Sequence, residues 1–359
     1  MPIWFTPATA VDEAMVRIIK SEDLVGLIPL DGAIEAVRRA YTAHAGAPGF
    51  GSTHTRLFDG NKRATFHPGG SVADNAVGIF AHFEHLHRAN NAQSYTGLGR
   101  RIYAMYDSET AELTAILLGS LPLFPFDPPT AHATETAITS AVGTALLARP
   151  DAKVLALIGT GRQAQRHLYV ANQLFSLEEV RVFSRDPDNV ASFCNDMSDW
   201  ATAPLRQMAD VGAAVDKADI VICATASLRP VLDGNRLAPG CHVTSIVNGN
   251  RLISPDGTPM FRRELDNKTV QRADVICAVL REQAIKDEQG DLFEPVSKGI
   301  INWDDIRDLS DVLAGRCSGR TTPAQITLFK QNSDQGIGFM ALARLAYEIA
   351  KRENIGIEL

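Results

Sequence analysis

The stretch Lys153-Val-Leu-Ala-Leu-Ile-Gly-Thr-Gly-Arg-Gln-Ala164 decides the fold of this chain. An apolar run typical of a β-strand leads directly into Gly159-x-Gly161-x-x-Ala164, and a helix-forming segment follows. In such a unit the first glycine permits a tight turn, the second lets the backbone approach a pyrophosphate, and the third small residue allows close helix packing. The stretch therefore predicts a dinucleotide site at a helix N-terminus, formed by Gly159, Thr160, Gly161, Arg162, Gln163 and Ala164.

Two further strand-like runs follow at the spacing of a doubly wound parallel sheet. They cover residues 180–183 and 220–224, and the second leads into Thr225, Ala226 and Ser227, where a nucleotide would lie. Without these runs, a glycine turn in an ordinary α/β protein would explain the motif equally well. Their order and spacing favour the Rossmann-type interpretation.

The end of the second run indicates which dinucleotide is preferred. Ser184 and Arg185 follow it directly, and both offer hydrogen-bond donors to a 2′-phosphate on the adenosine ribose. NADP(H) is therefore expected ahead of NAD(H). NAD(H) remains possible because Asp186, one residue further on, could accept hydrogen bonds from a ribose 2′-hydroxyl. Arg185 could also be a solvated loop arginine.

A second, different kind of domain is expected before the nucleotide unit. Alternating apolar residues predict a mainly antiparallel sheet or partial barrel with flanking helices, its strands lying near residues 53–58, 64–67, 77–83, 101–106 and 113–118. The proline-rich stretch 121–129 marks the approach to a boundary, and a helix is expected at 134–148. The predicted domains are residues 1–130 plus 325–359 and residues 131–324. In this division a strand at 326–331 and an apolar-faced helix at 336–351 return to the first domain.

Composition excludes several classes of function. The 359 residues carry a formal charge of −7 with no basic block, so a nucleic-acid partner is not expected. No apolar run approaches the length of a membrane span, and the first residues do not have the pattern of a secretory leader. The five cysteines form no CxxC pair and are interpreted as thiols in a reducing cytoplasm. A small-molecule substrate is the expected partner.

Several motifs in order resemble the ornithine cyclodeaminase/mu-crystallin family over nearly the whole chain. They are Ser21-Glu-Asp-Leu24, Leu147-Ala-Arg-Pro-Asp-Ala152, the glycine turn, Ala224-Thr-Ala-Ser227, Gly240-Cys-His-Val243, Arg263-Glu-Leu-Asp266 and Thr327-Leu-Phe-Lys330. The resemblance implies NAD(P)(H) binding, a homodimer formed through the sheet domain, and chemistry on α-amino acids or their imines. It also places Val247 and Lys330 beside the cofactor, although Lys330 could equally be a surface lysine.

Three of the four catalytic groups that the resemblance implies are absent. Arg56 matches the first arginine, but Phe80 stands at the lysine position, Glu135 at the second arginine, and Gly249 or Asn250 at the aspartate. A carboxylate at 135 reverses the local charge and disfavours a simple α-carboxylate at that spot. Ordinary ornithine cyclodeaminase activity is therefore not expected. A ligand with a cationic nitrogen near Glu135 and an anionic group near Arg56 fits better.

Histidines and a glutamate cluster near the missing lysine. Strand alternation places His82 and Glu84 on the same face as Phe80, and an imidazole that titrates near neutrality suits a general acid or base. The pattern His-x-Glu-His-x-His could also suggest a metal, but a strand splits these ligands across two faces, so no metal is expected. The segment could equally be a solvated, histidine-rich loop. His67 and His132 are further candidates for the cleft.

Three functions are consistent with these residues. The first is an NAD(P)(H)-dependent oxidoreductase that acts on a C=N or CH–NH centre of an amino-acid-like substrate, with Arg56, His82, Glu84, Glu135 and Asn250 as candidate catalytic residues. The second is a redox-neutral cyclodeaminase or dehydratase that uses NAD(P)+ transiently. The third is a non-enzymatic NADPH-binding protein like the crystallin branch, which the lost catalytic groups favour.

Overall fold

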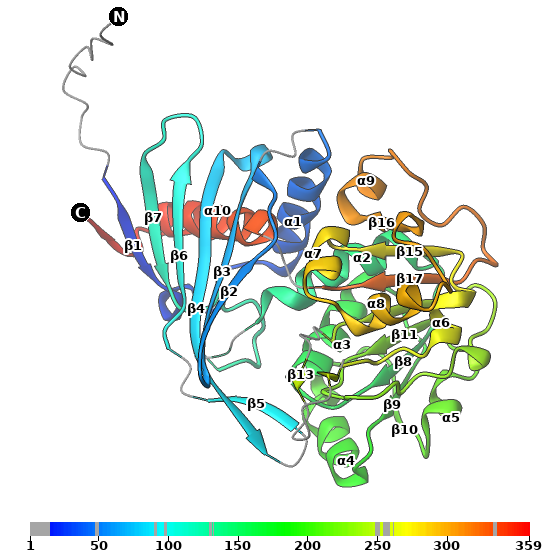
Figure 1. Ribbon diagram of the computed structural model, residues 1–359. Coiled ribbons are helices and arrows are strands. Elements are labelled where there is room, and N and C mark those ends of the chain that lie inside the picture. The colour runs from blue at the N-terminus through cyan, green and yellow to red at the C-terminus, as the bar shows by residue number, and fades with distance from the viewer. Residues whose placement is uncertain are drawn as a thin grey trace, which may run out of the picture.

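Two eight-stranded sheets and the helices around them make up the computed structural model (Figure 1). It describes residues 15–46, 50–89, 92–96, 99–128, 131, 133–247, 252–253, 259–260, 262–332 and 336–359. Within the described part of the chain, no helix is both long and apolar enough to cross a membrane. The predicted α/β class, with a parallel Rossmann-type sheet beside a mainly antiparallel one, is confirmed.

The first sheet has the strand order β18-β1-β7-β6-β4-β3-β2, with β5 paired to β4. Every neighbouring pair is antiparallel except β1 with β7. No pairing joins its edge strands β18 and β2 among the described residues, so the sheet is open rather than a closed barrel. Its strands are β1 (Arg17–Lys20), β2 (Thr55–Asp59), β3 (Lys62–Ser71), β4 (Ala76–Ala89), β5 (Ala92–Thr96), β6 (Ile102–Asp107), β7 (Leu113–Leu118) and β18 (Ile357–Glu358).

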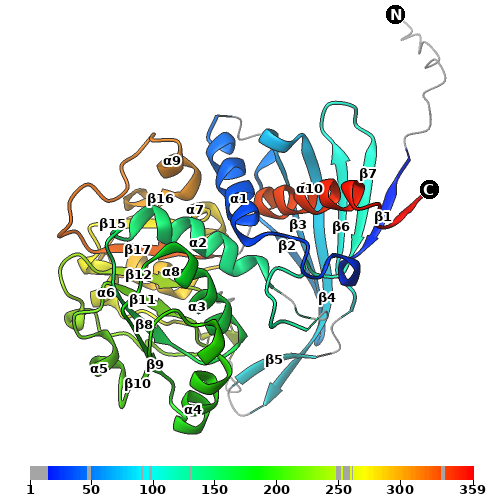
Figure 2. The same cartoon turned by 180° about the vertical axis from the view of Figure 1, so that it is seen from behind.

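In the part of the chain that the structure describes, helices cover one face of this sheet. α1 (Leu30–His44) and α10 (Gly336–Arg352) pack there, and Figures 1 and 2 show both on the same side. The paired residues Phe80 and Tyr103 face these helices and are buried. The return of the last helix to the first sheet is therefore confirmed.

The second sheet is parallel throughout, in the order β10-β9-β8-β11-β12-β17-β15-β16. Its first five strands follow the 3-2-1-4-5 order of a dinucleotide-binding fold. The strands are β8 (Val154–Ile158), β9 (Glu179–Phe183), β10 (Leu205–Gln207), β11 (Ile220–Cys223), β12 (His242–Ser245), β15 (Val275–Ala278), β16 (Ile306–Asp308) and β17 (Thr327–Lys330); a separate hairpin joins β13 (Leu252–Ile253) to β14 (Pro259–Met260).

The strand β17 corrects the predicted domain boundary at residue 325. It does not join the first domain but lies between β12 and β15 in the parallel sheet. All four of its residues are buried, as expected of a central strand covered on both faces. The remaining division of the chain into two domains stays a prediction. The other helices are α2 (Glu135–Leu147), α3 (Arg162–Leu174), α4 (Pro187–Asp196), α5 (Val211–Val215), α6 (Asn267–Arg272), α7 (Arg281–Lys286), α8 (Gly290–Ser297) and α9 (Leu309–Leu313).

Candidate functional site

The glycine turn lies where the strand order of the parallel sheet reverses, between β8 and β11. Gly159 has φ +118°, and a Cβ there would lie 2.2 Å from the carbonyl oxygen of Ala224, so only glycine fits. A Cβ on Gly161 would meet nothing within 4 Å. No side chain caps α3, which begins at the next residue. The turn therefore leaves backbone N–H groups and open space together, as a bound pyrophosphate requires.

The residues predicted around this turn take different parts. Ala164 is fully buried against the sheet, as helix packing requires. Gln163 donates from Nε2 to the carbonyl oxygen of Ala133 at 2.8 Å, which ties the helix to the segment before α2. A recess of about 400 Å³ beside the turn is lined by Phe126, Thr160, Arg162, Gln165, Asp196 and Met197. Thr160 and Arg162 thus border open space, whereas Gln163 and Ala164 hold the helix in place.

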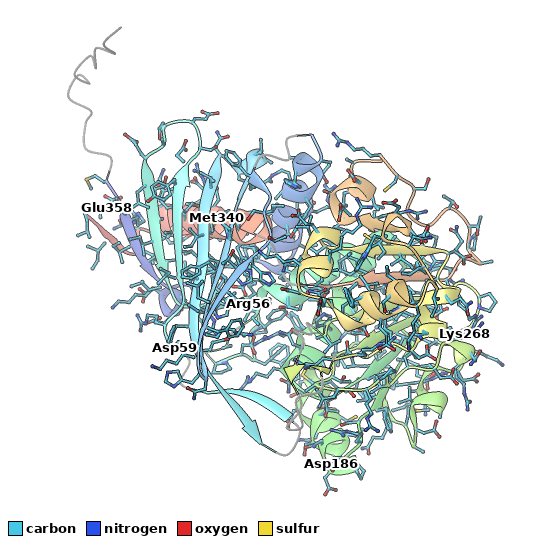
Figure 3. All side chains as sticks on the ribbon, viewed as in Figure 1. Arg56, Asp59, Asp186, Lys268, Met340 and Glu358 are labelled. Carbon is cyan, nitrogen blue, oxygen red and sulfur yellow. The ribbon has the colours of Figure 1, made fainter. Side chains whose placement is uncertain are left out.

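The end of β9 carries the predicted ribose contacts. Asp186 is the N-cap of α4, and its carboxylate accepts hydrogen bonds from the backbone N–H of Asp188 and from the side chain of Asn189, each at 3.0 Å. Ser184 is half-buried and Arg185 is exposed. Figure 3 shows Asp186 at the outer end of the parallel-sheet unit. The carboxylate is therefore engaged by its own helix, while Arg185 extends into solvent.

A buried carboxylate that the sequence analysis did not single out shapes the turn after β11. Glu264 is fully buried and accepts hydrogen bonds from the backbone N–H of Thr225 at 2.6 Å and of Val247 at 2.9 Å. The hydroxyl of Thr225 in turn accepts from the backbone N–H of Ser227 at 3.1 Å, and Ala226 between them is exposed. Glu264 thus holds the carboxyl ends of strands β11 and β12 close together. The motif Arg263-Glu-Leu-Asp266 was its only signal in the sequence.

Lys330 belongs to the same buried network. Its ammonium donates to Ser245 Oγ at 3.0 Å, to the carbonyl oxygen of Val247 at 2.7 Å and to Asp291 Oδ2 at 2.9 Å. The lysine is fully buried, so the alternative of a surface lysine is wrong. The ammonium of Lys330 is thus engaged by Ser245, Val247 and Asp291, and its place beside the cofactor stays a prediction.

The inner face of the first sheet brings His82 and Glu84 together, as strand alternation predicts. Nδ1 of His82 lies 3.2 Å from Oε1 of Glu84, and Arg63 donates from Nε to Oε2 of the same carboxylate at 3.0 Å. Burial opposes ionisation of Glu84, but contact with His82 and the charge of Arg63 outweigh it and lower the pKa of Glu84 to about 2. A charged carboxylate therefore lies beside the His82 imidazole, although the geometry at Nδ1 of His82 is not that of a hydrogen bond.

Arg56 also lies on this face but is engaged across the domain boundary. Its Nη1 donates to both carboxylate oxygens of Asp287 at 2.8 Å, and His54 Nε2 lies 3.1 Å from the same carboxylate. Burial lowers the pKa of His54 to about 4. Figure 3 shows Arg56 where β2 faces the parallel-sheet unit. Arg56 thus joins the two sheets, and its role as a substrate contact stays a prediction.

Glu135 begins α2 and is buried against the first sheet. Tyr103 donates its phenolic hydrogen to Oε1, whereas Oε2 is buried and has no hydrogen-bond partner among the described residues. The ring of Phe80 packs 4.6 Å from that of Tyr103 and 4.2 Å from that of Phe339. The ring of His67 lies 5.0 Å from that of Phe339. Aromatic rings therefore surround position 80, whose match to the family's lysine stays a prediction, and Oε2 of Glu135 has no hydrogen-bond partner among the described residues.

Some predicted positions lie outside the described residues, namely His132, Gly249 and Asn250. Within the described ranges, no group of three histidine, cysteine, aspartate or glutamate residues is arranged to hold a metal ion. His85 lies across the strand from His82 and packs against Phe83 with ring centroids 5.8 Å apart. The histidines are thus split between the two faces of β4, as the sequence pattern indicates.

The fold and this site define a class, a dinucleotide-binding protein with a second sheet that faces the nucleotide unit. The model of the ornithine cyclodeaminase/mu-crystallin family matches residues 121–354, and the chain belongs to that family. It is 27% identical over 256 residues to a Delta(1)-pyrroline-2-carboxylate reductase of Bacillus cereus, covering 71% of this chain and 72% of the relative. It is 28% identical over 244 residues to the ketimine reductase mu-crystallin of Mus musculus, covering 68% and 67%.

Solved structures share the whole fold. The Thermococcus litoralis Delta(1)-pyrroline-2-carboxylate reductase in complex with NADH and L-proline superimposes with a TM-score of 0.78 at 24% identity, covering 96% of this chain and all of that one. The iminosuccinate reductase of Paracoccus denitrificans in complex with NAD+ gives 0.78 at 20% identity, covering 96% and 99%. The similarity extends across both sheets, so the arrangement of the two units is that of the family.

Proposed function

We propose that this protein is an NAD(P)(H)-dependent oxidoreductase that reduces the C=N bond of an amino-acid-like imine or oxidises the corresponding amine. The observation that carries this proposal is the combination of an open glycine turn with a half-buried His82 beside the buried Glu84 on the facing sheet. The named activities of the relatives, pyrroline-carboxylate and ketimine reduction, are of the same class. When bound, the nicotinamide supplies or accepts the hydride.

NADP(H) is the preferred dinucleotide in this proposal. The carboxylate of Asp186 is occupied by the first turn of α4, so it is poorly placed to accept hydrogen bonds from a ribose. Ser184 and Arg185 are then the groups at the end of β9 that meet the adenosine side, and both favour a phosphate. NAD(H) binding at lower affinity is compatible with the same site.

His82 is proposed to donate the proton that the imine nitrogen gains as the adjacent carbon is reduced. Glu84 is proposed as a positioning residue, because its carboxylate lies 3.2 Å from Nδ1 of His82 and Arg63 holds that carboxylate in turn. In the reverse direction His82 would accept that proton. Glu135 is proposed to face the cationic nitrogen of the ligand through its unpartnered Oε2.

A steady-state assay with NADPH and Δ1-pyrroline-2-carboxylate, Δ1-piperideine-2-carboxylate and open-chain imino acids tests this function. We expect oxidation of NADPH with at least one of them. The Gly161→Asp variant should lose both turnover and NADPH binding because it places a carboxylate against the pyrophosphate. NADPH binding without turnover of any imine or amine would favour the crystallin-like alternative, which Phe80 and Glu135 support. Conversion of ornithine to proline without net NADPH change would favour the cyclodeaminase alternative.

A homodimer formed through the first sheet is proposed as the functional assembly. The face of that sheet opposite α1 and α10 is apolar, and paired strands align Leu57 with Ala64 and Phe83, and Ala81 with Ile102. Leu57 and Phe83 are 59% and 44% exposed, which is costly for a wide apolar face in water. A second copy of the same face is a suitable cover. Light scattering should give twice the chain mass, and a monomer at micromolar concentration contradicts the proposal.

A further inference from the structure

Arg101 is a buried arginine on the inner face of the first sheet. Ile102, the next residue, pairs with Ala81 on the outer face of β4, so Arg101 points to the opposite side, with His82. The backbone around it is held from two neighbouring strands. Gly99 donates to the carbonyl oxygen of Phe83 at 3.2 Å, and Gly119 donates to the carbonyl oxygen of Arg101 at 2.8 Å. The side chain therefore starts from a defined position beside the His82–Glu84 pair.

Arg101 differs from the other buried arginines in its partners. Arg17, Arg63, Arg166 and Arg263 each hold a carboxylate, namely that of Glu358, Glu84, Asp127 and Glu294. Arg101 is only 7% exposed, and its guanidinium makes no hydrogen bond or ion pair with a residue in the described ranges. Its nitrogens are not among the fully buried polar atoms that lack a partner, so they still reach open space that an anion can enter. A site that keeps such a group is prepared for an anion from outside the chain.

The surroundings of Arg101 support the same conclusion. Burial lowers the pKa of its guanidinium, and the nearby charges of Glu135 and Glu84 counteract that shift. Those two carboxylates are themselves committed, Glu84 to Arg63 and Glu135 through one oxygen to Tyr103. The two carboxylates therefore stabilise the charged form of Arg101 from a distance, and neither forms an ion pair with it. The family's arginine at position 135 is missing, and this guanidinium lies near that position on a different element.

We infer that Arg101 is the receptor for the substrate carboxylate and takes the part of the arginine that Glu135 replaces. This inference rests on the proposed function, because it assumes an amino-acid-like ligand between the two sheets. A planar guanidinium can hold a carboxylate through two parallel hydrogen bonds, which also fixes the orientation of the ligand. With Arg101 on the carboxylate and Glu135 on the nitrogen, the site selects α-amino and α-imino acids over simple amines and imines.

The kinetic test compares Δ1-pyrroline-2-carboxylate with Δ1-pyrroline, which lacks the carboxylate. In the Arg101→Met variant we expect KM for the carboxylate substrate to rise about 100-fold, while KM for Δ1-pyrroline stays within about twofold. Arg100→Met is the matched control, because Arg100 is 56% exposed and pairs only with Glu22. Equal changes for both imines, or no change for the carboxylate substrate, would overturn the inference.

A binding experiment keeps the inference testable if no imine is turned over. Calorimetry of the NADPH-loaded protein with the unreactive pyrrole-2-carboxylate and its neutral amide needs no catalysis. The native protein should bind the acid about 100-fold more tightly than the amide, and Arg101→Met should abolish that preference. Unchanged NADPH affinity shows that a variant is folded. If Arg101→Met is misfolded, Arg101→Lys is used in its place. If no imine is turned over but the native protein still binds the acid more tightly than the amide, only the proposed function is refuted. If the native protein binds the acid and the amide equally, the role of Arg101 is overturned.

Discussion

Replacement of Glu84 by glutamine separates the proton-donor role of His82 from the packing around it. Glutamine keeps the size of the side chain and one carbonyl acceptor for Arg63, but it removes the charge that lies 3.2 Å from Nδ1 of His82. If His82 donates a proton during imine reduction, the charge beside its ring should assist that transfer. Without the carboxylate, His82 loses the charge that faces Nδ1, so proton transfer should be slower.

The size of the effect follows from the contact distance and the burial. Removal of a charged neighbour at contact distance costs about 1.5–3 kcal/mol. If that interaction assists proton transfer, kcat should fall by about 10- to 150-fold. Stability should also fall by about 3–5 kcal/mol, because Arg63 is left buried with a neutral partner.

The assay is the rate of NADPH oxidation from pH 5 to 10 for native protein, Glu84→Gln and the control Glu109→Gln, whose side chain is exposed. NADPH affinity, measured in parallel by fluorescence, should be the same for all three because Glu84 is not part of the glycine turn. A Glu84→Gln variant with nearly native kcat across this pH range would refute the reasoning. His82 and Glu84 would then be a structural pair.

Three further predictions concern the cofactor, acid stability and assembly. Arg185→Ala should weaken NADPH binding about tenfold or more and leave NADH binding nearly unchanged, which calorimetric titration measures; equal loss for both would contradict the cofactor preference. Stability should decrease as pH falls from about 6.5 towards 4, by up to about 1.4 kcal/mol per pH unit for each buried neutral histidine, because the unfolded chain binds the protons first. Denaturant titrations at pH 7 and 5 test this, and a flat profile would be inconsistent with it. Phe83→Asp should convert a dimer to monomers in light scattering, while the control Val25→Asp, also exposed, should not. The buried histidines in the prediction on acid stability are His54, His167 and His242. Burial lowers their pKa values to about 4, about 4 and about 3, respectively.

Local patterns in the sequence predicted most of the fold. The glycine turn, the strands 53–118 and the last helix all depend on short-range signals, such as alternation and helical periodicity. β17 was assigned to the wrong sheet because its four residues carry no information about their neighbours in space. The short strands β1 and β18 were not predicted, since each is ordered by pairing with distant chain.

Contacts in the candidate site were predictable from the sequence only where both interacting residues lie on the same strand or helix. His82 and Glu84 lie two residues apart on β4, so alternation alone places them together. Arg56 was expected to contact substrate, but its partner Asp287 comes from the other sheet's unit, far along the chain. Lys330 and Glu264 gain their roles from a buried network of three segments. Arg101 has no motif at all, and what distinguishes it in the structure is a largely buried side chain that pairs with no carboxylate in the described ranges.

The place of β17 has a consequence for how the protein is made. Until residues 327–330 leave the ribosome, the strands β8 to β12 and the pair β15–β16 are two sheet fragments whose facing edges have no partner. The segment that follows then supplies α10, which covers the first sheet. Both units are therefore completed by residues 327–352, which are synthesised after the other strands of the parallel sheet. A nonsense mutation or proteolytic cut shortly before residue 327 would leave neither unit intact, and exposed strand edges make such a fragment a target for chaperones or aggregation.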